Sequence, residues 1–374
     1  MPPPSAASLL PLLPLLSLSL LPAPPSSDAS SSDASAVRVG TSAPPPSRSA
    51  SSITFLGTGS STGCPRPACL YAPSLLSSQL PSSSCRVSRL AASGDARANP
   101  DYRNNPSLLI AHRGSHAVVD AGKTFRESLT RFLPGLAIPG IDAIVLTHEH
   151  MDAFGGLDDV RGMQLPAADG SPRPMPIFLS PKTLSVVEST FPYLVPAPSP
   201  PLQAGSVREK RHVASLSFLP LAPFRPFALP ALPGERPLEV TPLPVVHGED
   251  CTCLGFAFGE QDAVLYLSDI SRLPPETRAW IKDWIKGLEA RGGRLAVLVV
   301  DALRESGSHN THFCLPQAAA LIRELRPGRA LLVGMGCDAF PPHEEMNEKL
   351  EGMFRGEGIE VRLARDGQRI ELNL

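Results

Sequence analysis

Two histidines one residue apart, followed closely by an aspartate, are the residues of this sequence best suited to chemistry. His148 and His150 come just after 142–146, a short apolar run with β-branched residues that predicts a buried strand. Asp152 follows two residues later. Neutral imidazole is the usual protein ligand of Zn²⁺, and a carboxylate can share such a site. The motif therefore predicts a metal site in a loop at a strand end, with solvated loop histidines as the alternative.

Further polar residues follow other predicted strands. His247 comes directly after a strand predicted at 240–246, and Asp269 follows one at 263–267. Strand ends on one edge of a sheet converge, so these side chains can share one site. Three imidazoles on one ion lower the pKa of bound water to about 7 and leave a coordination position open. Asp152 and Asp269 would then hold a second ion or hydrogen-bond the hydroxide. The alternatives are an ordinary loop histidine at 247 and a turn-capping aspartate at 269.

The elements that must position these residues alternate along the chain. We predict strands at 52–56, 107–111, 116–120, 142–146, 240–246, 254–258, 263–267, 295–300 and 330–333, with two short strands at the end. We predict helices at 124–133, 154–163, 276–290, 315–325 and 341–354. Residues 64–105 predict a loop-rich insertion, and the Pro-dense stretch 166–240 predicts irregular surface structure. This order predicts an α/β fold over 51–374: an αββα sandwich of two mixed β-sheets with helices on the outer faces.

Composition limits the classes of function. The 374 residues are 42% hydrophobic, so a sizeable hydrophobic core is possible. The net charge is −2, so no excess of positive charge indicates non-specific binding of nucleic acid. Aromatic content of 5% also argues against a stacking surface for single strands. The seven cysteines are odd in number and scattered, which is typical of a reduced compartment rather than a disulfide framework.

Residues 1–50 differ in composition from the rest of the chain. They are rich in Ser, Ala and Pro, and no charged side chain precedes Asp28. The apolar stretch 9–21 is broken by Pro11 and Pro14, so it is too short for a membrane span, and no positive region marks a signal peptide. We interpret the segment as an organellar transit peptide of a chloroplast or mitochondrion; a disordered tail on a cytoplasmic protein is the alternative.

Motifs that recur in order make the chain similar to the metallo-β-lactamase superfamily. The motifs are Phe55-Leu-Gly-Thr-Gly59, Arg103-Asn-Asn-Pro-Ser107, Val118-Val-Asp-Ala-Gly122, His148-x-His150-x-Asp152 and Tyr266-Leu-Ser-Asp269. The resemblance covers residues 52–374. Within the superfamily, the chain most resembles the branch that contains the bacterial cyclic phosphodiesterase of phosphonate metabolism and a group of uncharacterised eukaryotic hydrolases.

The resemblance implies a role for each residue of the constellation. His148, His150 and His247 would hold the first metal ion, Asp269 would bridge, and Asp152 would belong to a second ion. His312 matches the histidine that contacts phosphate and protonates the leaving oxygen in related phosphodiesterases. A helix-capping or surface histidine is the alternative there, and His309 is a weaker candidate for the same role. Asp120 and Asp301, both at strand ends, would orient imidazoles.

The sequence departs from the superfamily pattern at two positions. Ala153 stands where the motif has a second-metal histidine, and Cys337 replaces the last histidine. Because a thiolate can bind Zn²⁺, the second site is expected as Asp152, Asp269 and Cys337, or as weak or empty. Related bacterial enzymes also carry a cysteine cluster in the early insertion. Here the early cysteines lack Cys-x₂-Cys spacing, so buried free thiols are the preferred interpretation.

These observations predict a metal-dependent hydrolase that cleaves a phosphodiester bond through a metal-bound hydroxide. Its cofactors would be one or two Zn²⁺ ions, with Mn²⁺ as an alternative, and its partner a small phosphodiester or nucleotide-like substrate. No nucleic-acid-binding surface or membrane segment is expected, and both a monomer and a homodimer are compatible with the sequence. A tRNase Z-like nuclease for RNA 3′ ends, a thioester or lactam hydrolase, and a catalytically quiet scaffold are the alternatives.

Overall fold

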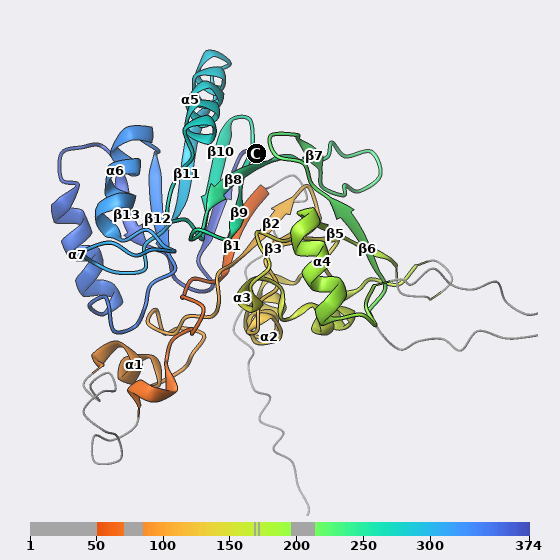
Figure 1. Cartoon of the computed structure of the whole chain (residues 1–374), viewed down its shortest axis with the longest axis horizontal. Helices are drawn as coiled ribbons and strands as arrows, with labels where there is room; N and C mark the ends of the chain where they lie inside the picture. The colour runs from red at the N-terminus through yellow and green to blue at the C-terminus, as the bar shows by residue number, and fades with distance from the viewer. Residues whose placement is uncertain (1–50, 71–84, 168–169, 171–172, 196–213) are drawn as a thin grey trace, which may run out of the picture. The chain divides into compact units, whose positions relative to one another are not determined.

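The structure is a computed structural model of the chain, and it describes residues 51–70, 85–167, 170, 173–195 and 214–374 (Figure 1). The transit peptide predicted for residues 1–50 lies outside the described residues. None of the described helices combines the length and the apolar character needed to cross a membrane.

The first half of the chain forms most of one seven-stranded sheet. Its strand order is β14-β1-β2-β3-β4-β5-β6, with antiparallel pairs from β14 to β3 and parallel pairs from β3 to β6. The bounds of its strands are β1 Ser51–Gly57, β2 Ser107–His112, β3 Ser115–Val119, β4 Ala143–Val145, β5 Met175–Leu179, β6 Leu216–Pro220 and β14 Arg369–Leu372. The last strand of the chain therefore closes the edge beside the first.

The second half forms another seven-stranded sheet, with the order β13-β12-β11-β10-β9-β8-β7. Its pairs are parallel from β13 to β10 and antiparallel from β10 to β7. The bounds are β7 Phe227–Ala228, β8 Glu239–Val246, β9 Thr252–Phe258, β10 Asp262–Leu267, β11 Arg294–Asp301, β12 Arg329–Val333 and β13 Glu360–Leu363. Both sheets are thus mixed, as predicted.

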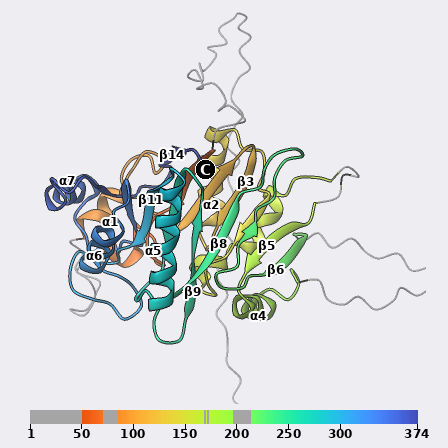
Figure 2. The same ribbon diagram turned by 90° about the horizontal axis from the view of Figure 1, so that it is seen from above.

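Helices cover both outer faces of the sheet pair (Figures 1 and 2). Those that follow the first sheet's strands are α1 Arg86–Ala91, α2 Phe125–Leu136, α3 Met151–Phe154 and α4 Pro181–Thr190, with short 3₁₀ helices at Pro67–Cys69 and Leu157–Met163. Those of the second half are α5 Pro275–Ala290, α6 Leu315–Leu325 and α7 His343–Met353. Figure 1 shows α6 and α7 beside the second sheet and α2 and α4 beside the first.

The buried apolar residues of the sandwich form three layers, because the central strands bury both of their faces. The central layer joins the two sheets and includes Phe55 of β1 and Tyr266 of β10. A second layer lies between the second sheet and α5, α6 and α7, and a third between the first sheet and α2 and α4. These layers confirm the predicted αββα sandwich.

The structure differs from the predicted elements in two places. The helix predicted at 154–163 is instead the four-residue α3 followed by a 3₁₀ helix at Leu157–Met163. The Pro-dense region also contains more regular structure than predicted: β5, α4 and β6 extend the first sheet there. Pro181 occupies the start of α4, where the missing N–H costs nothing, so proline begins this helix rather than breaking it.

Gly122 holds the metal loop close to the end of β3. A Cβ atom at this position would lie 1.8 Å from the backbone oxygen of Asp152, and Ala121 N donates to the oxygen of Ala153 at 2.7 Å. Gly122→Ala should therefore lower the free energy of unfolding by about 1–3 kcal/mol, measured by chemical denaturation. Gly162→Ala is the matched control, because a Cβ there meets nothing within 4 Å. Equal stabilities of the two variants would contradict this account.

Candidate metal centre

Three histidines from two sheets meet at one edge of the sandwich. His148 and His150 follow β4 of the first sheet, and His247 follows β8 of the second. The ring centroids lie 4.6 Å apart for His148 and His150, and 5.1 Å apart for each of these with His247. One ring nitrogen of each lies within 4.8 Å of the others. The arrangement is that of three ligands around one ion.

Hydrogen bonds fix which nitrogen of His148 faces this centre. Thr147 Oγ1 lies 2.9 Å from Oδ2 of Asp120 and 2.8 Å from Nδ1 of His148. Because the Asp120 carboxylate accepts the Thr147 hydroxyl proton, the threonine oxygen accepts a proton from His148 Nδ1. His148 Nε2 is then a lone-pair atom, and it is buried without a hydrogen-bond partner. Such an atom needs a ligand.

His247 is held in the same tautomer by the backbone. Its Nδ1 lies 2.6 Å from the carbonyl oxygen of Thr311. A carbonyl only accepts hydrogen bonds, so Nδ1 carries the proton and Nε2 keeps its lone pair. Burial lowers the pKa of His148 to about 3 and also lowers that of His247. Both rings are therefore neutral at neutral pH, the form that binds a metal ion.

Asp120 acts on the centre through Thr147 rather than through an imidazole. It follows β3 with a left-handed backbone, at a φ of 62°, and also accepts the N–H of Thr147 at 2.8 Å. A non-glycine residue with this backbone conformation is strained. The hydrogen bonds to Thr147 offset that strain and hold the carboxylate in place. Asp120 therefore orients an imidazole, as predicted, and it does so through the threonine that contacts His148.

A second group of polar side chains adjoins the first. His247, Asp269 and His312 offer ligand atoms within 4.8 Å of one another, and the rings of His247 and His312 lie 4.7 Å apart. Nδ1 of His312 is 2.7 Å from Oδ2 of Asp301 and 4.0 Å from Oδ1 of Asp269. Burial alone would lower the pKa of His312, but the Asp301 carboxylate outweighs it and raises this pKa to about 9. Asp301 therefore orients an imidazole, as predicted, and His312 keeps a proton.

The predicted second metal site is not assembled among the described residues. No group of three metal-binding side chains there includes Asp152 or joins Asp269 to Cys337. The residue directly after β12 is Gly334, at a φ of 80°, and a Cβ on it would lie 2.5 Å from Oδ1 of Asp301. A histidine at this position would therefore collide with the carboxylate that holds His312. Among the described residues, the candidate metal-binding groups of this centre are therefore the three histidines and the group of His247, Asp269 and His312.

The structure places Cys337 in a different cluster, which corrects the prediction for this residue. Its sulfur lies 3.8 Å from that of Cys69, and the sulfur atoms of Cys69, Cys85 and Cys337 are mutually within 4.8 Å. Cys64 packs in the same buried cluster. A tetrahedral Zn²⁺ with Zn–S bonds of about 2.3 Å holds its sulfurs about 3.8 Å apart. These cysteines are buried free thiols, as expected, and three of them lie close enough together to hold an ion as thiolates.

Metal analysis of Cys69→Ser tests this cluster. We expect the variant to contain about one ion per chain less than the native protein and to unfold at a lower temperature, because a structural thiolate site stabilises the fold. Turnover per histidine-bound ion should be retained. Cys251→Ser is the control, since Cys251 is also buried but lies outside the cluster. Equal metal contents of native protein and both variants would show that the cysteines hold no ion.

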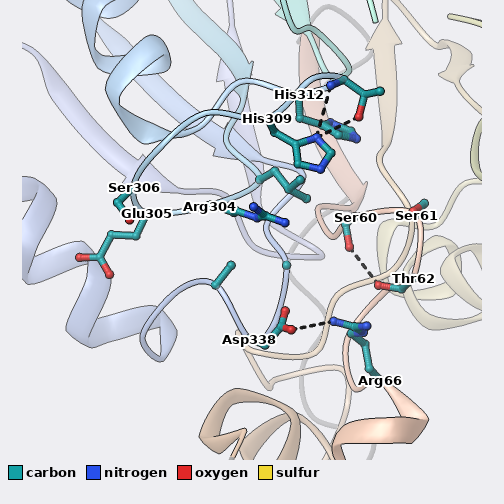
Figure 3. A pocket seen from close by; sticks show the side chains of 14 residues that line it. Ser60, Ser61, Thr62, Arg66, Arg304, Glu305, Ser306, His309, His312 and Asp338 are labelled. Carbon is teal, nitrogen blue, oxygen red and sulfur yellow. Dashed lines mark hydrogen bonds and ion pairs between the residues drawn. The ribbon is translucent and has the colours of Figure 1, made fainter. Parts of the chain in front are cut away.

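Sequence reasoning missed several residues of the site. Thr147 and the carbonyl of Thr311 set the tautomers of two histidines, and Arg304 extends into the pocket beside His312 (Figure 3). Thr147 could have been found, since it stands between a buried strand and the first histidine. A backbone carbonyl carries no sequence signal, so the role of Thr311 could not.

Comparison with known proteins identifies the family. The model of the beta-lactamase superfamily domain matches residues 116–335, more than half of the chain. The chain therefore belongs to the metallo-β-lactamase fold superfamily, whose characteristic members are metal-dependent hydrolases. Within it, the chain resembles a diphosphatase of the PhnP family, with 27% identity and a TM-score of 0.61 over 86% of this chain and 97% of that one.

Two further proteins are similar. Human tRNase Z, short form, matches in fold with a TM-score of 0.50 at 15% identity, over 85% of this chain and 98% of that one. An octanoyltransferase from Porphyromonas gingivalis is 25% identical over 85% of this chain and 52% of its own length. The chain thus spans about half the length of this curated relative.

Proposed function

We propose that this protein is a metal-dependent phosphodiesterase that hydrolyses a small phosphodiester substrate. The observation that supports the proposal is that a group of metal-binding histidines and a histidine able to donate a proton lie side by side at one edge of the sandwich. One is the histidine trio with its orphaned Nε2 atom of His148. The other is His312, fixed by Asp301 at 2.7 Å. The first suits an ion that polarises a phosphoryl oxygen, and the second suits an acid for the leaving group.

His148, His150 and His247 would hold the ion, which we propose to be Zn²⁺, with Mn²⁺ as the alternative. When bound, the ion supplies a Lewis acid and makes a water molecule acidic. The chain itself contributes the orientation of the rings, through Thr147 and the carbonyl of Thr311. Asp269 lies within reach of both His247 and His312, so it would position the attacking water between them.

His312 would protonate the leaving oxygen. Asp301 accepts a hydrogen bond from Nδ1, which turns Nε2 away from Asp301. His312 also lines a pocket large enough for a nucleotide-sized molecule, so a leaving group can lie against it. The similarity to a diphosphatase of the PhnP family supports a phosphorus centre rather than a carbonyl.

Metal content and turnover together test the proposal. Purified protein should contain metal and hydrolyse bis(p-nitrophenyl) phosphate and a 2′,3′-cyclic nucleotide. Full metal without turnover of either would point to another bond type, such as a thioester or lactam. Absence of metal from the histidines would favour a catalytically quiet scaffold protein. Cleavage of a tRNA precursor would favour a tRNase Z-like nuclease. Each of these three results contradicts the proposal in a different way.

A further inference from the structure

The histidine trio is divided between two loops that belong to different sheets. His148 and His150 lie in the loop after β4, and His247 begins the loop that joins β8 to β9. A hydrogen bond from His247 N to the carbonyl oxygen of Cys251, at 2.9 Å, closes this second loop. All three imidazoles can hold one ion only while the two loops keep a fixed spacing. Contacts that connect the loops therefore bear on how firmly the site retains a metal ion.

Glu149 stands between the two histidines of the first loop, and helix α4 holds its carboxylate. The side chain of Glu149 is only 10% exposed. Its Oε1 lies 2.5 Å from Nζ of Lys182, and its Oε2 accepts a hydrogen bond from Oγ1 of Thr183 at 3.5 Å. Both partners lie in the first turn of α4, and the N-terminal end of a helix also favours a negative charge. The first histidine loop is thereby attached to α4.

The same ammonium group of Lys182 also contacts the second loop. Its Nζ donates to the carbonyl oxygen of Asp250 at 2.8 Å. Asp250 lies in the loop that His247 begins, and the thiol of Cys251 in that loop is 3.8 Å from Oε1 of Glu149. An ammonium group has three N–H donors, so it can satisfy a carboxylate and a carbonyl together. Lys182 therefore connects the two loops through one atom.

We propose that Lys182 is a positioning residue of the metal centre. By bridging the carboxylate of Glu149 and the backbone of Asp250, it keeps the loop of the first two histidines at the spacing from His247 that one ion requires. The inference rests on the part of the proposed function that assigns the ion to the three histidines. It adds that retention of the ion depends on a residue that does not touch it.

The affinity of Lys182→Met for Zn²⁺ tests this role. Methionine keeps most of the length of the side chain without its charge. The dissociation constant for Zn²⁺, measured by competition with a chelator, should rise by about 10- to 100-fold, the usual effect of removing a group that orients metal ligands. The unfolding temperature of the metal-free protein should fall by less than about 4 °C, because an ion pair whose lysine is 54% exposed contributes little to stability. Lys182→Arg should recover most of the affinity, since a guanidinium keeps the charge and several donors.

Lys282→Met is the matched control. Lys282 pairs with Glu324 at 2.8 Å, and its side chain is 48% exposed, but this pair joins α5 to α6. The control variant should bind Zn²⁺ as the native protein does. Any ion held by the cysteines is common to all of these proteins, so it cancels in the comparison.

The outcomes separate this inference from the proposed function. Equal Zn²⁺ affinities of native protein and Lys182→Met would overturn the role of Lys182, as would a loss that Lys182→Arg does not reduce. A fall of more than about 10 °C in the unfolding temperature of metal-free Lys182→Met would also overturn it, because the residue would then serve folding. If the native protein binds Zn²⁺ at the histidines but hydrolyses no phosphodiester, the proposed function alone fails. Native protein without Zn²⁺ at the histidines would overturn both.

Discussion

His148→Ala should remove the ion of the histidine centre and lower phosphodiesterase turnover by at least about a thousandfold. The reason is that a metal ion contributes several kcal/mol to stabilising charge in the transition state, and each 1.36 kcal/mol is a factor of ten. His148 is the most deeply buried ligand of the trio, and its Nε2 has no other partner.

The metal content of His148→Ala must be corrected for any ion that the cysteine cluster holds. We expect the variant to keep the ion held by Cys69, Cys85 and Cys337, so its total content should fall by about one ion per chain rather than to zero. In the background of Cys69→Ser, the same change should leave no ion. His116→Ala on β3 is the histidine control and should keep both metal and turnover. Native turnover in His148→Ala would show that the trio does not hold the catalytic ion.

His312→Ala should keep its metal yet lose about 10²- to 10⁴-fold in turnover of a 2′,3′-cyclic nucleotide. An alkoxide leaving group needs a proton, and His312 is the histidine that a carboxylate holds in position to supply one. The loss on bis(p-nitrophenyl) phosphate should be less than about tenfold, because p-nitrophenolate leaves without protonation. Stopped assays on both substrates, with metal analysis of each sample, measure the contrast.

His309→Ala tests the alternative assignment of this role. The His309 ring lies 5.6 Å from that of His312, and its Nδ1 contacts the hydroxyl of Thr311 at 3.0 Å rather than a carboxylate. We expect this variant to show the smaller loss and no dependence on the leaving group. If His309→Ala loses more turnover than His312→Ala, and the loss depends on the leaving group, then His309 rather than His312 is the general acid.

The sequence predicted the sandwich because its core strands are short apolar runs that end in polar residues. Strands such as β9, β10 and β11 are buried over nearly their whole length, so their limits are clear from hydrophobicity alone. Local signals failed where proline suggested irregular structure, at β5, α4 and β6. They also failed at 154–163, where the chain forms two short turns of helix around glycines packed against the β3 end.

The candidate site was predictable as far as strand ends could be aligned. His148, His150, His247 and Asp269 all follow strands, and the structure brings them to one edge. The partner of Cys337 was not predictable, because it depends on how Cys64, Cys69 and Cys85 pack against the loop after β12. Spacing within the early insertion was the wrong criterion: the thiol that completes the cluster lies more than two hundred residues away. The hydrogen bond from His247 to a backbone carbonyl was equally unpredictable, because a carbonyl has no sequence signal.

Anomalous scattering from a crystal of the native protein, recorded at the zinc and manganese edges, locates the catalytic ion. A peak should lie about 2.0–2.1 Å from a ring nitrogen of each of His148, His150 and His247 if the ion is Zn²⁺. A fully metal-loaded, hydrolytically active crystal with density only at the cysteines, or beyond bonding distance of His247, would contradict the claim that three imidazoles hold the catalytic ion.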